Sequence, residues 1–259
     1  MDLLSGLNKQ QKKAVTTTDG PLMILAGAGS GKTRVIIQRI SYLIKIMKVP
    51  PEQILAVTFT NKAAAEMQER LKGIIPFNNK DVHLSTFHSL GVSLLRKSIH
   101  HLGYSSNFII YDTKDQFSVI KTIIENQNLV DSNLIDAKLV HFEICQAKSA
   151  SKEPEKLLME KFSSQNQVFA KIYQKYQEIL HGCNAIDFED ILLFTLRLFE
   201  NYPKVMDSLA DRFRYIMVDE YQDTNITQYK LLKYLTKNHN NLCVVGDDGQ
   251  SFYGWRGAE

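Results

Sequence analysis

The sequence contains little of what is typical of an exported, metal-bound or membrane-spanning protein. It has three cysteines in 259 residues, Cys145, Cys183 and Cys243, which lie far apart in the sequence. We therefore expect a reducing, cytoplasmic compartment and neither a disulfide framework nor a zinc site. No apolar run approaches the ~18 residues that span a bilayer, and residues 1–10 (MDLLSGLNKQ) lack a signal-peptide core. We expect neither export nor a membrane partner.

The charges nearly balance, at net +3 from 31 basic and 28 acidic side chains. They are unevenly distributed: residues 1–88 carry 12 basic and 6 acidic groups (net +6), and residues 187–259 carry 8 and 12 (net −4). A basic amino-terminal third is compatible with a polyanionic partner, but a solvated surface has the same pattern. With 44% hydrophobic residues, the composition excludes wholesale disorder.

Short apolar runs alternate with helical patterns toward both ends of the chain. The runs that predict buried strands are Leu22–Leu25, Ile54–Val57, Ile216–Val218 and Leu242–Val245, with a weaker one at Val82–Leu84. Three are followed by helical patterns, at Lys32–Met47, Lys62–Ile74 and Thr227–Thr236. This alternation predicts an α/β fold with a parallel sheet covered on both faces.

The middle of the chain has a different character. Apolar residues recur at helical spacing, with almost no strand signal, in Leu90–Leu102, Gln116–Leu129, Leu157–Ala170 and Ile172–Leu180. The simplest topology is a helical subdomain, residues 89–186, inserted into an α/β domain formed by residues 1–88 and 187–259. The segment Ala147–Glu155 (AKSASKEPE) is the best candidate for an exposed loop.

A glycine-rich segment, AGAGSGKT, lies between the first predicted strand and the following helix. This context is typical of a phosphate-binding loop, in which glycines turn backbone N–H groups inward at a helix N-terminus. Lys32 would reach phosphates and the Thr33 hydroxyl would hold Mg²⁺. A glycine-rich structural turn is the alternative, and Ala26 stands where the strict pattern has glycine. The predicted binding residues are Ala26, Gly27, Ala28, Gly29, Ser30, Gly31, Lys32 and Thr33.

Two acids follow the predicted strand in YIMVDEYQDT (residues 215–224). At the carboxyl end of a parallel strand, Asp219 and Glu220 can both face a bound phosphate. We expect Asp219 to bind or orient hydrated Mg²⁺ and Glu220 to polarise an attacking water. A solvated strand end is the alternative for these two acids alone. Together with the glycine-rich loop, they predict nucleotide hydrolysis.

Seven segments, in order, resemble motifs of the UvrD/Rep/PcrA group of superfamily 1 DNA helicases. They are LNKQQKKAV (7–15), AGAGSGKT (26–33), VTFTNKAAAEMQER (57–70), STFHS (85–89), DFEDIL (187–192), VDEYQDTN (218–225) and VVGDDGQSFYGWRGA (244–258). The resemblance covers the whole chain. It implies the amino-terminal half of such a helicase: a RecA-like P-loop NTPase domain (1A) with an inserted helical subdomain (1B).

The resemblance also implies roles for individual residues. Gln11, with Gln10 as an alternative beside it, would recognise adenine, since glutamine can pair with adenine N6 and N7. Gln250 would sense the γ-phosphate. The residues implied to contact DNA by stacking or phosphate binding are Phe59, Thr60, Asn61, His88, Tyr253, Trp255 and Arg256. Gly249 replaces the acid that the family usually has before this glutamine, and Phe252 replaces a small aliphatic residue.

The activity implied by the resemblance is ATP- and Mg²⁺-dependent translocation on single-stranded DNA, 3′ to 5′, with unwinding at single-strand/duplex junctions. DNA-repair or replication-restart proteins would be partners. Because family members continue into a second RecA-like domain that supplies arginine fingers, we expect this chain alone to be weak or inactive. The alternative is a non-hydrolysing module that binds ATP and DNA and needs a partner half. A helicase–nuclease is disfavoured because no nuclease-type carboxylate cluster is visible.

Overall fold

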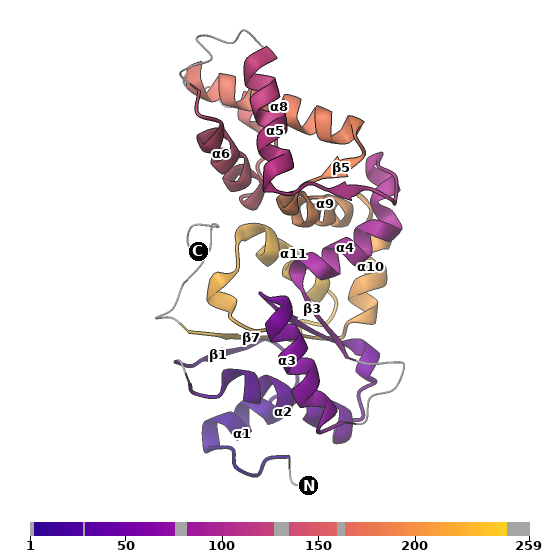
Figure 1. Cartoon of the computed structure of the whole chain (residues 1–259). Helices are drawn as coiled ribbons and strands as arrows, with labels where there is room; N and C mark the ends of the chain where they lie inside the picture. Colours follow the sequence, from indigo (N-terminus) through magenta and orange to yellow (C-terminus); the bar gives the residue numbers. More distant parts are fainter. Residues whose placement is uncertain (1–2, 28, 76–81, 127–134, 160–163, 248–259) are drawn as a thin grey trace. The chain divides into compact units, whose positions relative to one another are not determined.

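The structure, a computed structural model, describes residues 3–27, 29–75, 82–126, 135–159 and 164–247 (Figure 1). The chain forms two compact units. The first contains the residues up to Leu90, Tyr202–Thr224 and the residues from Gln228 onward; the second contains Gly91–Asn201 and Asn225–Thr227. Within the described ranges, no helix combines the length and apolar character needed to cross a bilayer.

The first unit is built on a five-stranded parallel sheet with the strand order β1-β7-β6-β2-β3. Its strands are β1 (Leu22–Leu25), β2 (Ile54–Thr58), β3 (His83–Thr86), β6 (Tyr215–Val218) and β7 (Leu242–Gly246). Its helices are α1 (Lys9–Thr16), α2 (Lys32–Lys45), η1 (Pro51–Gln53), α3 (Asn61–Lys72), α10 (Pro203–Arg212), η4 (Tyr221–Asp223) and most of α11 (Ile226–Thr236). The predicted α/β class with a parallel sheet is confirmed.

Both faces of the sheet are buried along its central strands β2, β6 and β7, which explains why these strands are continuous apolar runs rather than alternating patterns. The edge strand β1 differs, because Met23 and Leu25 are exposed. On one face, Ile54 and Ala56 of β2 pack with α2 and α3, whose apolar stripes include Ile40 and Met67. The alternate residues of β2, Leu55 and Val57, are equally buried on the other face. Figure 1 shows α2 on one side of the sheet and α11 on the other. Each buried Leu, Ile or Val contributes about 1.5–3 kcal/mol.

The second unit is mostly helical. Its elements are most of α4 (Phe87–Ser98), η2 (Ile99–Leu102), β4 (Ile109–Ile110), α5 (Thr113–Asn126), α6 (Ala137–Ser149), α7 (Pro154–Met159), α8 (Ser164–Gly182), β5 (Ala185–Ile186) and α9 (Phe188–Asn201). The parallel pair β4–β5 was not predicted, because two-residue strands have no measurable period. Within the predicted helical stretch Leu157–Ala170, the residues that the structure describes are helical, in α7 up to Met159 and in α8 from Ser164; α8 continues to Gly182 and also contains the predicted stretch Ile172–Leu180.

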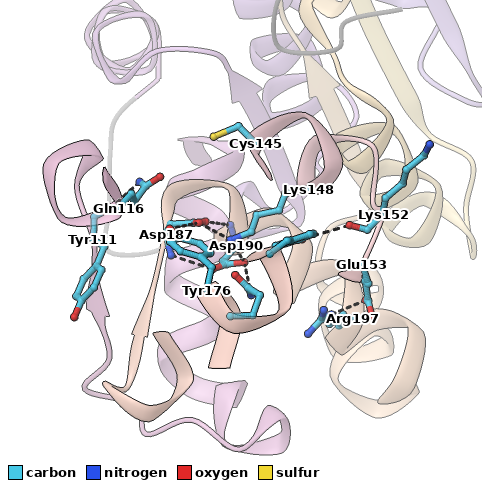
Figure 2. Close-up of polar contacts among 12 residues, drawn as sticks. Tyr111, Gln116, Cys145, Lys148, Lys152, Glu153, Tyr176, Asp187, Asp190 and Arg197 are labelled. Atoms are coloured by element: carbon cyan, nitrogen blue, oxygen red, sulfur yellow. Dashed lines mark hydrogen bonds and ion pairs between the residues drawn. The ribbon is translucent and has the colours of Figure 1, made fainter. Parts of the chain in front are cut away.

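A buried ionic cluster connects α6 to the start of α9 (Figure 2). Asp187 and Asp190 cap α9 reciprocally: the Asp190 N–H donates to Asp187 Oδ1 (2.8 Å), and the Asp187 N–H donates to Asp190 Oδ2 (3.1 Å). Lys148 of α6 donates to Asp187 and lies 2.8 Å from Asp190 Oδ1, and the Tyr176 hydroxyl donates to Asp187 (2.9 Å). The prediction of an exposed loop over Ala147–Glu155 is therefore wrong for its first three residues, because α6 extends to Ser149 and Lys148 is buried.

Candidate functional site

The glycine-rich loop connects β1 to α2 at the carboxyl edge of the sheet. The Ala26 N–H donates to the Gly246 carbonyl (3.0 Å), which places the start of the loop beside the end of β7. Gly31 is the N-cap of α2 in the left-handed region (φ 86°), and Gly29 is left-handed as well (φ 71°). Only glycine adopts these angles without strain. The loop therefore turns directly into a helix N-terminus, where N–H groups and the helix dipole favour an anion.

Lys32, the first residue of α2, faces two carboxylates. Its Nζ lies 3.4 Å from Asp247 Oδ2 and 3.8 Å from Glu220 Oε2. Asp247 follows β7 and Glu220 follows β6, and these two strands are neighbours in the sheet. The lysine is thus held by acids from two strand ends, at distances long enough for a phosphate oxygen to replace them.

Thr33 and Asp219 form the second pair at this edge. The Thr33 hydroxyl donates to Asp219 Oδ2 over 3.3 Å. Burial, followed by the negative charge of Glu220, raises the pKa of Asp219 to about 6. A hydroxyl and a carboxylate at a phosphate loop are oxygen donors that Mg²⁺ prefers, and this ion usually takes only one or two carboxylates besides phosphates and waters. The donor set therefore fits Mg²⁺, which would also favour the ionised form of Asp219.

Glu220 is held in an unusual backbone conformation. Its φ of 52° and ψ of 46° lie in the left-handed region, which non-glycine residues adopt at a cost of order 1–3 kcal/mol. Its N–H donates to Asp219 Oδ1 (3.1 Å), and its Oε2 accepts from Gln222 Nε2 (2.7 Å). The strained turn and these two contacts direct the Glu220 side chain toward Lys32.

Gln11 connects α1 to the glycine-rich loop. Asn8 and Gln11 form a capping box, in which the Gln11 N–H donates to Asn8 Oδ1 (2.8 Å) and the Asn8 N–H donates to Gln11 Oε1 (3.0 Å). The Gln11 Nε2 donates to the Ser30 carbonyl (3.0 Å). At the other end of α1, the buried Arg39 guanidinium donates to the carbonyls of Ala14, Thr17 and Thr18. Of the two candidate glutamines, Gln11 is the one whose side chain meets the loop.

A second group of predicted residues lies where β2 and β3 end. Thr60 is the N-cap of α3, and its side chain accepts from the Ala63 N–H (3.1 Å). Asn61 Oδ1 accepts from the Ser89 hydroxyl (3.3 Å), next to His88 in α4. Phe59 is half-buried, with its ring edge-on to Phe87 (centroids 6.2 Å apart). Since β2 and β3 are adjacent, Phe59, Thr60, Asn61 and His88 lie close together at the same edge of the sheet.

The chain resembles known proteins over nearly its whole length. The sequence profile of the UvrD/REP helicase N-terminal domain matches residues 7–259. The chain belongs to the UvrD/REP helicase N-terminal domain family. The chain is also similar to proteins named ATP-dependent DNA helicase PcrA: 48% identical to the one from Bacillus subtilis and 45% to one from Staphylococcus aureus. Each alignment covers 99% of this chain and 35% of the relative, so the chain spans about a third of the length of these curated relatives.

Membership of the UvrD/REP family confirms the predicted resemblance to the amino-terminal half of UvrD/Rep/PcrA helicases and the predicted RecA-like P-loop fold. The roles of individual residues stay predictions, but the described structure gathers Gln11, Lys32, Thr33, Asp219 and Glu220 along one sheet edge. Several predicted residues lie outside the described part of the chain: Ala28, Gln250, Tyr253, Trp255 and Arg256.

Sequence reasoning missed two residues that the structure places at this candidate site, Gln222 and Asp247. Asp247 directly follows an apolar strand, as Asp219 does, so the same strand-end rule could have identified it. Gln222 has no comparable signal. Its contacts depend on β6 and β7 being neighbours, which is a property of the strand order and not of the local sequence.

Proposed function

We propose that this chain binds ATP and Mg²⁺ at the carboxyl edge of its sheet and forms the amino-terminal part of an ATP-driven helicase that translocates on single-stranded DNA. The observation that carries this proposal is the convergence of Lys32, Thr33, Asp219 and Glu220, from two segments about 190 residues apart, on one glycine-rich loop. The family and the printed names of the relatives support it.

Each side chain at this edge has a proposed task. Lys32 exchanges its carboxylate partners for phosphate oxygens, and the loop N–H groups bind the same anion. Thr33 and Asp219 hold Mg²⁺, which when bound neutralises phosphate charge. The Glu220 carboxylate orients the attacking water and accepts its proton. Gln11 turns from its contacts with Asn8 and Ser30 to pair with adenine.

DNA is proposed to bind at the ends of β2 and β3. Phe59 can stack a base, and Thr60, Asn61 and His88 lie where they can contact phosphates. Tyr253, Trp255 and Arg256, with Gln250 as the γ-phosphate sensor, complete the proposal on the basis of their resemblance to the helicase motif. Movement from 3′ to 5′, unwinding at single-strand/duplex junctions, partners in repair or replication restart and a cytoplasmic location are parts of the same proposal.

The nucleotide part is tested by measuring phosphate release, with and without single-stranded DNA, alongside binding of a fluorescent ATP analogue. Lys32→Ala should weaken binding, because it removes a phosphate contact. Glu220→Gln should slow release ~10²–10⁴-fold while binding persists, because it removes the proton acceptor. Lys45→Ala, at the other end of α2, is the matched control. Binding without any release in the unmutated chain would support the non-hydrolysing alternative. Equal binding by the wild type and Lys32→Ala would contradict both.

The DNA part has a separate test. Photo-crosslinking of single-stranded DNA to the chain, followed by peptide mapping, should label the segment that contains Phe59 and His88. Phe59→Ala should reduce this label, since the stacking of one base contributes ~1–3 kcal/mol. Labels confined to other segments would exclude the proposed DNA path.

A further inference from the structure

We propose that Gln222 is a positioning residue for the reaction: its side-chain amide connects the Glu220 carboxylate to the main chain that follows β7. This inference rests on the proposed function, because it gives Gln222 a role in directing the proton acceptor of ATP hydrolysis. Gln222 lies between Glu220, which follows β6, and Asp247, which follows β7, and its side chain forms a hydrogen bond with each of these residues.

The contacts form a closed ring of four residues from three segments: Lys32, Glu220, Gln222 and Asp247. Gln222 Nε2 donates to Glu220 Oε2 (2.7 Å), and Gln222 Oε1 accepts from the Asp247 N–H (3.0 Å). Lys32 closes the ring through Asp247 Oδ2 (3.4 Å) and the same Glu220 oxygen (3.8 Å). The shortest contact in the ring is therefore the one between Gln222 and the proposed proton acceptor.

The chemistry of the ring requires an amide at position 222. One end must donate to a carboxylate and the other must accept from an N–H, and an uncharged glutamine does both. A glutamate would keep the acceptor but lose the donor, and would place a second negative charge beside Glu220. The Glu220 side chain has 43% of its surface exposed, so burial alone does not fix its orientation.

The backbone around the ring is adapted to this close approach. A Cβ added to Gly246 would lie 3.0 Å from Gln222 Oε1 and 3.5 Å from the Gln222 backbone nitrogen, so a side chain at 246 would press on the glutamine. The left-handed turn at Glu220 also brings residues 220 and 222 to the same side of the chain. Strain at Glu220 persists because surrounding contacts hold it, and the Gln222 amide is one of them.

The role is tested with Gln222→Ala, Gln222→Glu and, as a matched control, Gln68→Ala at an exposed glutamine of α3. In single-turnover phosphate release, both Gln222 variants should be slowed ~10- to 100-fold, less than the 10²–10⁴-fold that a general base contributes. Affinity for the ATP analogue should stay within about threefold, because a positioning residue acts on the chemical step. In a Glu220→Gln background, Gln222→Ala should cause no further slowing, because its effect passes through Glu220.

Two further measurements, hydrogen exchange and NMR, do not depend on ATP hydrolysis by the chain. The Asp247 amide should be protected from hydrogen exchange in the wild type and in Gln222→Glu, and unprotected in Gln222→Ala. The Gln222 side-chain amide resonance should shift in Glu220→Ala. An unchanged resonance or a protected Asp247 amide in Gln222→Ala would overturn the contacts. Wild-type turnover in Gln222→Glu would overturn the role. A wild type that binds no nucleotide refutes the proposed function and this role with it, and the exchange data still report whether the ring exists.

Discussion

Two lysines of this protein each face two carboxylates, and the two clusters differ in nearly every physical respect. Lys148 contacts Asp187 and Asp190, and the side chains of all three have at most 1% of their surface exposed (Figure 2). Lys32 contacts Asp247 and Glu220 at 3.4 and 3.8 Å, with side-chain exposures of 9%, 7% and 43%. We call the first the closed cluster, because its contacts are short and its side chains are buried. We call the second the open cluster, because its contacts are longer and Glu220 is partly exposed.

We interpret this difference as one between a structural role for Lys148 and the proposed role of Lys32 in nucleotide binding. The partners of the buried carboxylates come from within the second unit: Tyr176 donates to Asp187, and Gln177 donates to Asp190 (3.2 Å). No water or ligand is needed to satisfy them, as buried charges require partners. At Lys32, the contacts are longer than the 2.7–2.9 Å of a strong charge-assisted hydrogen bond, so an incoming anion can replace them. The distance and exposure of a lysine–carboxylate pair thus distinguish the two roles.

The largest effect on stability is expected when the closed cluster is broken. Lys148→Met keeps most of the side-chain volume but leaves Asp187 and Asp190 without their cation. Removing one partner of a buried ion pair costs about 3–5 kcal/mol, so we expect a loss of this size in the free energy of unfolding. Urea denaturation followed by circular dichroism measures it, with Lys152→Met, an exposed lysine four residues on, as the control.

A combined variant distinguishes lost charge from lost packing. If unpaired charge is the cause, Lys148→Met together with Asp187→Asn and Asp190→Asn should recover part of the stability, because no buried charge remains. A Lys148→Met protein as stable as the Lys152→Met control would remove the basis for the comparison between the two clusters.

A change of pH is expected to have a smaller effect on the free energy of unfolding. Burial, followed by the charge of Asp187, raises the pKa of Asp190 to about 7. A carboxyl whose pKa is higher in the folded state stabilises below its unfolded value, near 4, and this contribution is lost as pH rises to about 7. The free energy of unfolding of wild type relative to Asp190→Asn should therefore fall across this window, by at most about 1.4 kcal/mol per pH unit.

The pKa of the neighbouring Asp187 is shifted in the opposite direction, with the opposite effect on stability. The positive charge of Lys148 holds the pKa of Asp187 below its usual range despite burial, so the contribution of Asp187 is lost only as pH falls below about 4. Denaturation of both proteins between pH 5 and pH 8 isolates Asp190. A difference that is constant with pH would show that Asp190 stays ionised.

The same contrast explains what could be predicted from sequence. The glycine-rich loop, Asp219 and Glu220 were predictable because each follows an apolar strand within a few residues, so local pattern and position in the sheet coincide. Gln222 was not, because its partner Asp247 comes from a strand that only the sheet order brings close. Lys148 was expected in an exposed loop because it lies among small polar residues. Its burial depends on α9 and α8, about 30–40 residues further along the chain.

The smallest change in stability is expected at the open cluster, where the same substitution affects binding instead. Lys32→Met should alter the free energy of unfolding by no more than about 1 kcal/mol, since its contacts are long and Glu220 is partly solvated. Affinity for the ATP analogue should fall roughly 10- to 100-fold, which corresponds to the ~1.5–3 kcal/mol of a hydrogen bond to a charged group. Urea denaturation and fluorescence titration of the same sample measure both. A loss of stability equal to that of Lys148→Met, with affinity unchanged, would mean that both lysines are structural and that distance and exposure do not separate their roles.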